Sequence, residues 1–129
     1  MLNNVDALIS AVAREPSAIA IVDGVKKIDY KNLLKYSSII GCNLKRLGLC
    51  KGDKISTLLQ NNWQFCCLYW ACQLYGFVLV PLNWRTNSEE LDYFLEDSDS
   101  KCIVFQNISF KTVTLSLRSK DLFKISLEN

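Results

Sequence analysis

The chain has 129 residues, about the length of one ordinary domain, and its 50% hydrophobic and 22% charged residues exclude an intrinsically disordered chain. Fifteen basic and thirteen acidic residues give a formal net charge of +2, and they are interleaved along the sequence. This pattern gives no indication of a nucleic-acid partner, and the adjacent basic pairs Lys26-Lys27 and Lys45-Arg46 fit solvated faces.

The first third of the sequence predicts a helix, a hairpin and a second helix. Residues 5–13 carry an amphipathic pattern that ends at Pro16, with apolar positions at Leu8, Ile9, Val12 and Ala13. Two β-branched runs within residues 18–30 flank Asp23-Gly24, a pair that favours a two-residue type I′ turn and hence a β-hairpin. Asp29 is a favourable N-cap for a helix over residues 30–47 that Gly48 ends. The apolar face of this helix would contain Leu33, Tyr36, Ile40, Leu44 and Leu47.

An uncharged run, residues 55–84, raises the question of a membrane span, because its part from Phe65 to Leu82 has the necessary length. Glycine and proline divide it, however. "CKGDK" predicts a turn, "ISTLL" at residues 55–59 a strand, and residues 63–75 a helix with Gly76 as a left-handed C-cap. Residues 77–80 then predict a strand closed by Pro81. The helix has no continuous polar face, so we expect it to be buried all round, with a membrane span as the minor alternative.

The remainder of the sequence predicts a helix from "SEELDYFLEDSDS", with Asn87 or Ser88 as its cap and a buried stripe of Leu91, Phe94 and Leu95. Residues 102–105 predict a strand, residues 110–117 a short helix, and residues 122–127 a last strand. Helices of crossover length alternate with short apolar strands, which is typical of βαβ units. We therefore expect an α/β fold: an N-terminal β-hairpin followed by βαβ units that form a mostly parallel sheet.

The cysteines fit a reducing compartment. The N-terminal segment lacks the basic start and apolar stretch of a secretory signal, so we expect a cytoplasmic protein. No two cysteines have a C-x-x-C spacing and the sequence has no histidine, so a metal site would need four scattered thiolates. Buried free thiols are expected instead, at Cys42, Cys50, Cys66, Cys67, Cys72 and Cys102.

Catalytic patterns are absent from the sequence. The five glycines do not form a phosphate loop, and "GLCKGDK" carries Asp53 where an acid would repel a phosphate. Without histidine, no serine or cysteine has its usual base. The carboxylate pairs Glu89-Glu90 and Glu96-Asp97 fit a capped, solvated helix. The residues therefore predict no catalytic, cofactor-binding or metal site in this chain.

Three segments nevertheless resemble a known family. "IDYKNL" at residues 28–33 resembles the L-T-Y-x-E-L segment of the adenylate-forming, AMP-binding superfamily, and "LGLCKGDKISTLLQNN" is similar to its G-V-x-K-G-D-x-V-A-x-L-L-x-N. "YGFVLVPLNWR", followed by "SEELDYFLEDSDSK", is most similar to the fatty-acyl-CoA synthetases. The resemblance runs in order from about residue 18 to 105, and more faintly to 129.

This resemblance implies an AMP-forming ligase, in which ATP and Mg²⁺ activate a fatty acid as acyl-adenylate and coenzyme A displaces AMP. The family's phosphate loop, its ATP- and Mg²⁺-binding segment, its ribose-binding aspartate and its C-terminal domain with the adenylation lysine have no match in these 129 residues. The expectation is an incomplete N-terminal segment, residues 1–129 with no second domain, that is inactive alone. A free-standing interaction module or one subunit of a split ligase is the alternative.

The resemblance also sets the expected partners: the remaining segments of the ligase, if it is split, and a fatty acid in the complete enzyme. An apolar surface left uncovered would favour self-association, and peripheral membrane contact stays open, with no transmembrane span and no nucleic acid. The chain departs from the family at Asp29, where threonine is usual, at Asn32, where glutamate is usual, and at Tyr75, where a small residue is usual. Arg85 matches a family arginine, for which we expect a structural role in the loop after the strand.

Overall fold

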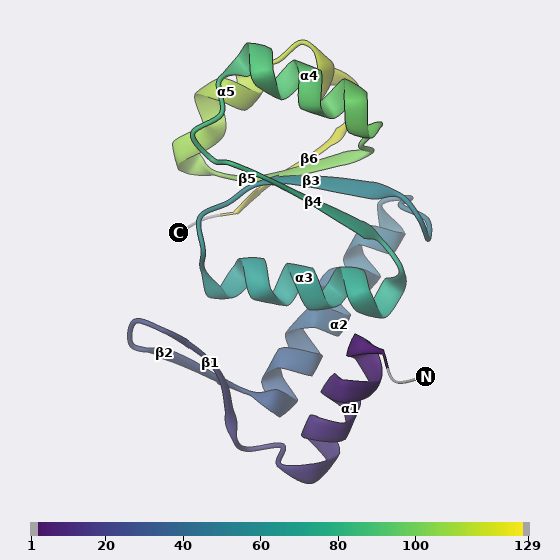
Figure 1. Ribbon diagram of the computed structural model, residues 1–129, viewed down its shortest axis with the longest axis vertical. Helices are drawn as coiled ribbons and strands as arrows, with labels where there is room; N and C mark the ends of the chain where they lie inside the picture. Colours follow the sequence, from purple (N-terminus) through teal and green to yellow (C-terminus); the bar gives the residue numbers. More distant parts are fainter. Residues whose placement is uncertain (1–2, 128–129) are drawn as a thin grey trace. The chain divides into compact units, whose positions relative to one another are not determined.

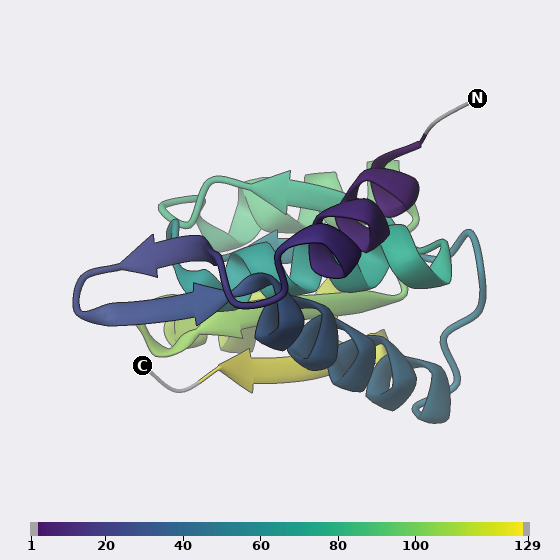
Figure 2. The same cartoon turned by 90° about the horizontal axis from the view of Figure 1, so that it is seen from below.

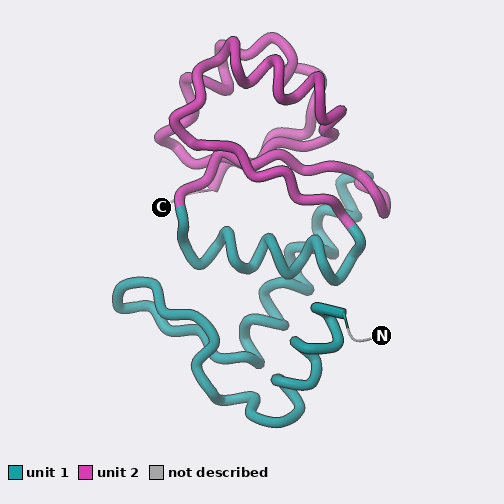
Figure 3. The backbone as a smooth tube through the Cα atoms, viewed as in Figure 1, with its two compact units in different colours: residues 1–48, 61–76 teal, residues 49–60, 77–129 magenta. Residues whose placement is uncertain are grey.

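The computed structural model describes residues 3–127 and consists of two compact units (Figure 3). Unit 1 comprises Met1–Gly48 and Asn61–Gly76, and unit 2 comprises Leu49–Gln60 and Phe77–Asn129. The chain therefore leaves unit 1, enters unit 2, returns for one helix and then completes unit 2.

Unit 1 contains three helices and a hairpin (Figure 1): α1 (Asn4–Arg14), β1 (Ile19–Asp23), β2 (Lys26–Asp29), α2 (Tyr30–Arg46) and α3 (Trp63–Tyr75). Each helix begins at a short polar N-cap. The predicted cap of α2 is confirmed, because Asp29 Oδ1 accepts the Asn32 N–H at 2.8 Å. Asn3 caps α1 and Asn62 caps α3 in the same way. Gly76, at φ 76°, is the left-handed C-cap predicted for α3.

The hairpin is confirmed, but its turn lies one residue further along than predicted. Asp23 pairs with Lys26, so the two central residues are Gly24 and Val25. Of these two only Gly24 has a positive φ, 59°, which fits a type II′ turn and not the type I′ turn expected at Asp23-Gly24. Asp23 stays in the strand because its carboxylate has another role: Oδ2 accepts the Trp63 N–H at 2.9 Å at the start of α3.

The predicted apolar faces of α1 and α2 are correct only in part. In α1, Leu8 is buried while Ile9 is 46% exposed and Ala13 is exposed, since the face that packs inward follows Leu8, Ala11 and Val12 at helical spacing. In α2, Leu33 and Leu44 are buried and Tyr36 and Ile40 half-buried, but Leu47 lies past the helix end and is 46% exposed.

Small residues let α2 and α3 approach each other closely. Ser37 and Gly41, one turn apart on α2, are both buried. The ring of Tyr75 occupies the place that a Cβ on Gly41 would need, and its hydroxyl donates to the Ser38 carbonyl at 3.2 Å. Ser37 Oγ is buried and has no hydrogen-bond partner among the described residues. Sequence patterning did not identify this pair of small residues.

The prediction that α3 is buried all round is wrong. Its buried residues are Cys67, Leu68, Ala71 and Cys72, whereas Gln73 is exposed and the remaining residues are half-buried. Apolar composition therefore did not translate into full burial within this chain. Over residues 3–127, no helix has both the length and the apolar character needed to cross a membrane.

Unit 2 contains a parallel four-stranded sheet in the order β4-β3-β5-β6, which confirms the predicted βαβ pattern. Its elements are β3 (Lys54–Leu58), β4 (Val78–Leu82), α4 (Ser88–Ser98), β5 (Cys102–Gln106), η1 (Asn107–Ser109), α5 (Phe110–Leu115), η2 (Arg118–Asp121) and β6 (Phe123–Leu127). Figure 1 shows α4 and α5 over the same face of the sheet. Its hydrophobic core contains Leu58, Leu91, Leu95, Ile103, Phe105 and Val113.

Two local expectations in unit 2 are corrected. Pro81 does not close β4, because the strand continues to Leu82 and Pro81 stands in register with Thr57. An edge strand tolerates proline where no outer hydrogen bond is needed, and β4 is at the edge of the sheet. In α4, Asn87 is the N-cap, which confirms one of the two expected caps, but Phe94 of the expected buried stripe is only half-buried.

Candidate functional site

The carboxyl ends of β3 and β5 form the part of unit 2 where a ligand site is most expected. These two strands are adjacent, yet the chain continues from β3 to β4 on one side and from β5 to β6 on the other. In open parallel sheets, ligands bind outside the carboxyl ends of the strands at such a reversal of strand order. The described residues that follow these two strands are therefore the first candidates for function.

Gln106 joins the two strand ends. It is the last residue of β5, its side chain is 3% exposed, and Oε1 accepts the Gln60 N–H at 2.6 Å. This contact satisfies a backbone donor just after β3 and holds the loop against β5. A neutral amide in this role orients backbone but supplies no nucleophile or base. Gln106 was not among the residues that the sequence pattern singled out, although a polar residue at the end of an apolar strand was a usable signal.

The loop after β4, residues 83–87, is held by its own side chains. Asn83 Oδ1 accepts the Arg85 N–H at 3.0 Å, and the Asn83 carbonyl accepts the Thr86 N–H at 2.9 Å. Ser109 Oγ donates to the Trp84 carbonyl at 3.1 Å and so connects the loop to η1. The loop is therefore fixed on the sheet edge before any ligand arrives.

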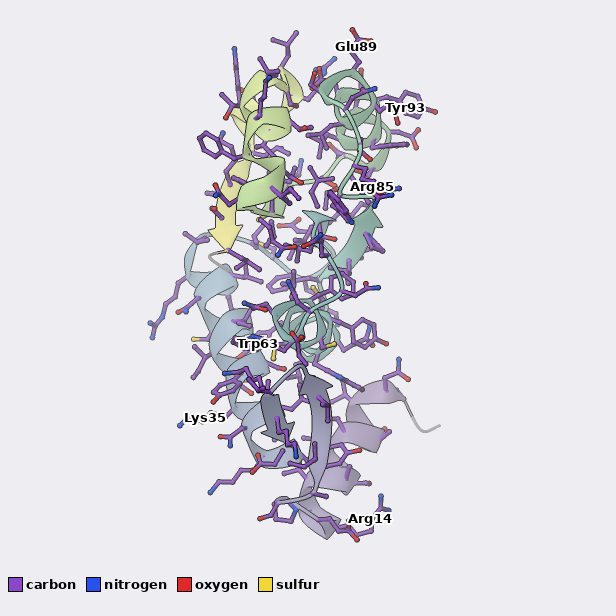
Figure 4. All side chains as sticks on the ribbon, turned by 90° about the vertical axis from the view of Figure 1, so that its left-hand side faces the viewer. Arg14, Lys35, Trp63, Arg85, Glu89 and Tyr93 are labelled. Atoms are coloured by element: carbon purple, nitrogen blue, oxygen red, sulfur yellow. The ribbon has the colours of Figure 1, made fainter. Side chains whose placement is uncertain are left out.

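Arg85 is exposed, and its guanidinium carbon lies 4.7 Å from the centroid of the Trp84 ring. This stacking contact agrees with the predicted structural role, because it holds the side chain against its own loop. Figure 4 shows Arg85 near the sheet edge, with Glu89 and Tyr93 further along α4. Among residues 3–127, no acceptor forms a hydrogen bond or ion pair with the Arg85 guanidinium.

A shallow hollow of about 390 Å³ lies beside this loop, lined by Pro81, Leu82, Asn83, Arg85, Thr86, Glu90 and Phe94. Its charged side chains are Arg85 and Glu90. The Glu90 carboxylate accepts from Asn87 Nδ2 at 2.7 Å, so it completes the cap of α4. The hollow can hold a group that carries both apolar surface and a hydrogen-bond acceptor for Arg85.

The other acidic side chains considered as a catalytic pair have structural roles or face solvent. Glu89 is in the first turn of α4, where a negative charge is favourable, and Glu96 forms an exposed ion pair with Arg118 at 3.1 Å. Asp92 instead fixes the segment after α5: its Oδ1 accepts from Ser116 Oγ at 2.5 Å and from the Arg118 N–H at 3.0 Å. Desolvation raises the pKa of Asp92, but these hydrogen bonds and the Arg118 charge outweigh it, so the pKa lies below its ordinary value.

The thiols are poor nucleophiles where they are buried. Burial raises the pKa of Cys102 to about 12, and burial together with the neighbouring Cys66 raises that of Cys67 to about 11. The expectation of burial holds for the thiols of Cys67, Cys72 and Cys102, whereas Cys42 and Cys66 are half-buried and Cys50 is exposed. Among residues 3–127, no cluster of three or more histidine, cysteine or acidic side chains could hold a metal ion.

Comparison with known proteins gives a consistent answer. The profile of the AMP-binding enzyme family matches residues 8–126. Over 62 residues the chain is 39% identical to the long-chain-fatty-acid–CoA ligase FadD13 of Mycobacterium tuberculosis, covering 48% of this chain and 12% of that enzyme. It is 34% identical over 107 residues to the 2-succinylbenzoate–CoA ligase of Oceanobacillus iheyensis, covering 83% of this chain and 22% of that enzyme.

Structural comparison extends this similarity over nearly the whole chain. The inhibitor-bound N-terminal domain of FACL13 from Mycobacterium tuberculosis superposes with a TM-score of 0.90 at 25% identity, over 98% of this chain and 34% of that domain. The chain thus spans between 12% and 22% of the two ligases that it matches in sequence. It corresponds to about a third of the FACL13 N-terminal domain.

Proposed function

Since this chain belongs to the AMP-binding enzyme family, we propose that it is the N-terminal segment of an AMP-forming fatty-acyl-CoA synthetase and has no ligase activity alone. The observation that carries the proposal is the superposition on the N-terminal domain of FACL13, which covers 98% of this chain. The sequence identity of 39% to a long-chain-fatty-acid–CoA ligase supports a fatty acid as the carboxylate.

The relatives share one type of reaction although their names differ in the acid. One of the two ligases is named for joining long-chain fatty acids to coenzyme A, and the other for joining 2-succinylbenzoate to coenzyme A. The complete enzyme would accordingly use ATP, Mg²⁺ and coenzyme A. The described residues do not fit these groups: they have no metal-ligating cluster, and the sequence has no glycine-rich phosphate loop. No step of the reaction is therefore assigned to a side chain of this segment.

Within that enzyme the role of this segment would be architectural. It would supply the first four strands of a parallel sheet, with a loop at residues 83–87 that is already ordered by its own hydrogen bonds. A cytoplasmic location, a single incomplete domain over residues 1–129, and an association with the remaining ligase segments belong to the same proposal. A split ligase, in which those segments form a separate chain, is its closest variant.

A chimera tests the proposal. The equivalent segment of FadD13 is replaced by the present chain, and fatty-acid-dependent AMP formation is measured with ATP, Mg²⁺ and coenzyme A. We expect activity from the chimera and none from either the 129-residue chain or FadD13 without its segment. Turnover by the chain alone, or a folded chimera without activity, would contradict the proposal.

A further inference from the structure

Two adjoining hollows form an apolar groove in unit 1. One, of about 410 Å³, is lined by Ala7, Leu8, Ala11, Ala20, Ile21, Tyr30, Leu33, Cys66 and Trp70. The other, of about 370 Å³, is lined by Ile21, Val22, Asp23, Asn61, Asn62, Trp63, Phe65 and Cys66. Ile21 and Cys66 line both, so the two hollows form one groove between the hairpin and helices α1 and α3. We call it the β1 groove.

The β1 groove follows the outer edge of strand β1. Side chains alternate between the two faces of a strand, yet the consecutive residues Ile21, Val22 and Asp23 line the same hollow. No residue of β2 lines either hollow. Figure 2 shows β1 as the hairpin strand on the α1 side. The groove therefore runs along the side of β1 that faces away from β2.

The backbone of Val22 offers an unsatisfied hydrogen-bonding edge to this groove. Asp23 and Lys26 close the two-residue turn, and Val22 pairs with Lys27 next to them. In an antiparallel ladder, hydrogen-bonded and non-hydrogen-bonded pairs alternate, so the N–H and C=O of Val22 point away from β2. Val22 is 65% exposed, and no described residue outside the hairpin bonds to its backbone. An exposed strand edge of this kind is a template for another strand.

We propose that an extended, apolar segment from the remaining ligase chain lies in the β1 groove and pairs with β1 as a third strand. This inference rests on the proposed function. The chain covers 34% of the FACL13 N-terminal domain, so about two thirds of the same domain lies outside it and is available to cover its surfaces. The main-chain edge supplies hydrogen bonds, and the apolar lining selects alternate side chains of the incoming strand.

The occupant is a segment of the same domain rather than a free peptide because the hairpin needs more than its own two strands. An isolated two-stranded ribbon is marginally stable, and although Ala20 and Ile21 pack against the core of unit 1, Ile19 and Val22 leave part of β1 uncovered. A third strand in the groove would cover the backbone of β1 together with Cys66.

Hydrogen exchange and cysteine alkylation on the FadD13 chimera test the inference. We expect the Val22 amide to exchange about tenfold more slowly in the chimera than in the chain alone. Alkylation of Cys66 should slow in parallel, while the exposed Cys50 reacts equally in both proteins. An unprotected Val22 amide in a folded chimera would overturn the inference.

A matched pair of variants locates the new strand. Val22→Pro removes the outward N–H of β1, and Lys27→Pro removes the equivalent outward N–H of β2 at the same cross-strand pair. We expect V22P to restore rapid Cys66 alkylation in the chimera and K27P to leave it slow. Equal effects of the two variants would contradict pairing at β1. The exchange measurement on the unsubstituted chimera stands even if V22P fails to fold.

The outcomes separate this inference from the proposed function. An active chimera with an unprotected Val22 amide would support the proposed function and contradict the third strand. A folded, inactive chimera with a protected Val22 amide would support the third strand and contradict the proposed function. Val22 protection in the chain alone that increases with its concentration would show a second copy at the β1 edge, and would overturn the assigned occupant.

Discussion

The contact between Gly41 and Tyr75 makes the packing of α2 on α3 testable. A Cβ on Gly41 would lie inside the Tyr75 ring, with the ring Cγ at 2.9 Å, and the ring is held by its hydroxyl bond to the Ser38 carbonyl. Gly41→Ala therefore has two opposing effects. Alanine is the better helix former by about 1 kcal/mol, whereas overpacking a buried contact typically costs about 1–3 kcal/mol.

We expect the overpacking cost to exceed the gain in helix propensity. Several ring atoms overlap the added carbon, and the ring is held by its bond to the Ser38 carbonyl, so the cost should be near the upper end of its range. Gly41→Ala should then lower the free energy of unfolding by about 1–2 kcal/mol. In a Tyr75→Ala background the obstruction is absent, and the same substitution should raise the free energy of unfolding by about 1 kcal/mol.

Urea unfolding followed by circular dichroism measures all four proteins of this double-mutant cycle, with similar m-values as the condition for comparing them. The expected coupling free energy is about 2–3 kcal/mol. Asn43→Ala, at an exposed position of α2, is the control and should have the same effect in both backgrounds. A coupling free energy below about 0.5 kcal/mol would refute the reasoning, because the Tyr75 ring would then not be the reason that position 41 requires glycine.

Three further predictions concern single side chains. Ser37→Ala removes a buried hydroxyl that has no partner among the described residues, so thermal unfolding should show a gain of about 1 kcal/mol; a loss of stability would indicate a hidden partner. Gln106→Leu leaves the Gln60 N–H without its acceptor and should cost about 1–3 kcal/mol in urea unfolding, with unchanged stability as the contrary result. Folding lowers the pKa of Asp92, so its carboxylate contributes to the stability of the fold above the ordinary pKa of 3.8. This contribution is lost as pH falls through the lowered pKa. The stability difference between the wild type and Asp92→Asn should therefore shrink below about pH 4, and a constant difference would contradict the assignment.

Local signals in the sequence predicted the order and type of the elements well. The N-cap at Asp29, the left-handed Gly76 and the cap at Asn87 depend on neighbours within four residues, and each is confirmed in place. The parallel sheet was predictable because buried strands such as residues 102–105 are continuous apolar runs separated by helices of crossover length. The hairpin turn was misplaced by one residue because Asp23 bonds to Trp63, 40 positions away, and this contact has no local signal.

Non-local packing accounts for the remaining differences. The family resemblance marked Tyr75 as a departure, but only the fold shows that Gly41 makes room for its ring. Similarly, the apolar composition of α3 predicted burial on every side, although burial depends on how much chain is present to cover a helix. Gln106 was missed because its role requires β3 and β5 to be adjacent, and it bonds to Gln60, 46 residues away in the sequence.

The polar groups at the sheet edge explain why the loops of this segment have a specific structure. Asn83, Asn87 and Gln106 each use a side-chain oxygen to accept from a backbone N–H group of this chain, at distances between 2.6 and 3.0 Å. Groups that accept in this way fix the loops on which they lie. The buried thiols with raised pKa values remain protonated at neutral pH, and histidine is absent from the sequence. The polar side chains at this edge therefore stabilise the loops of the segment, and the buried thiols are held in their neutral form.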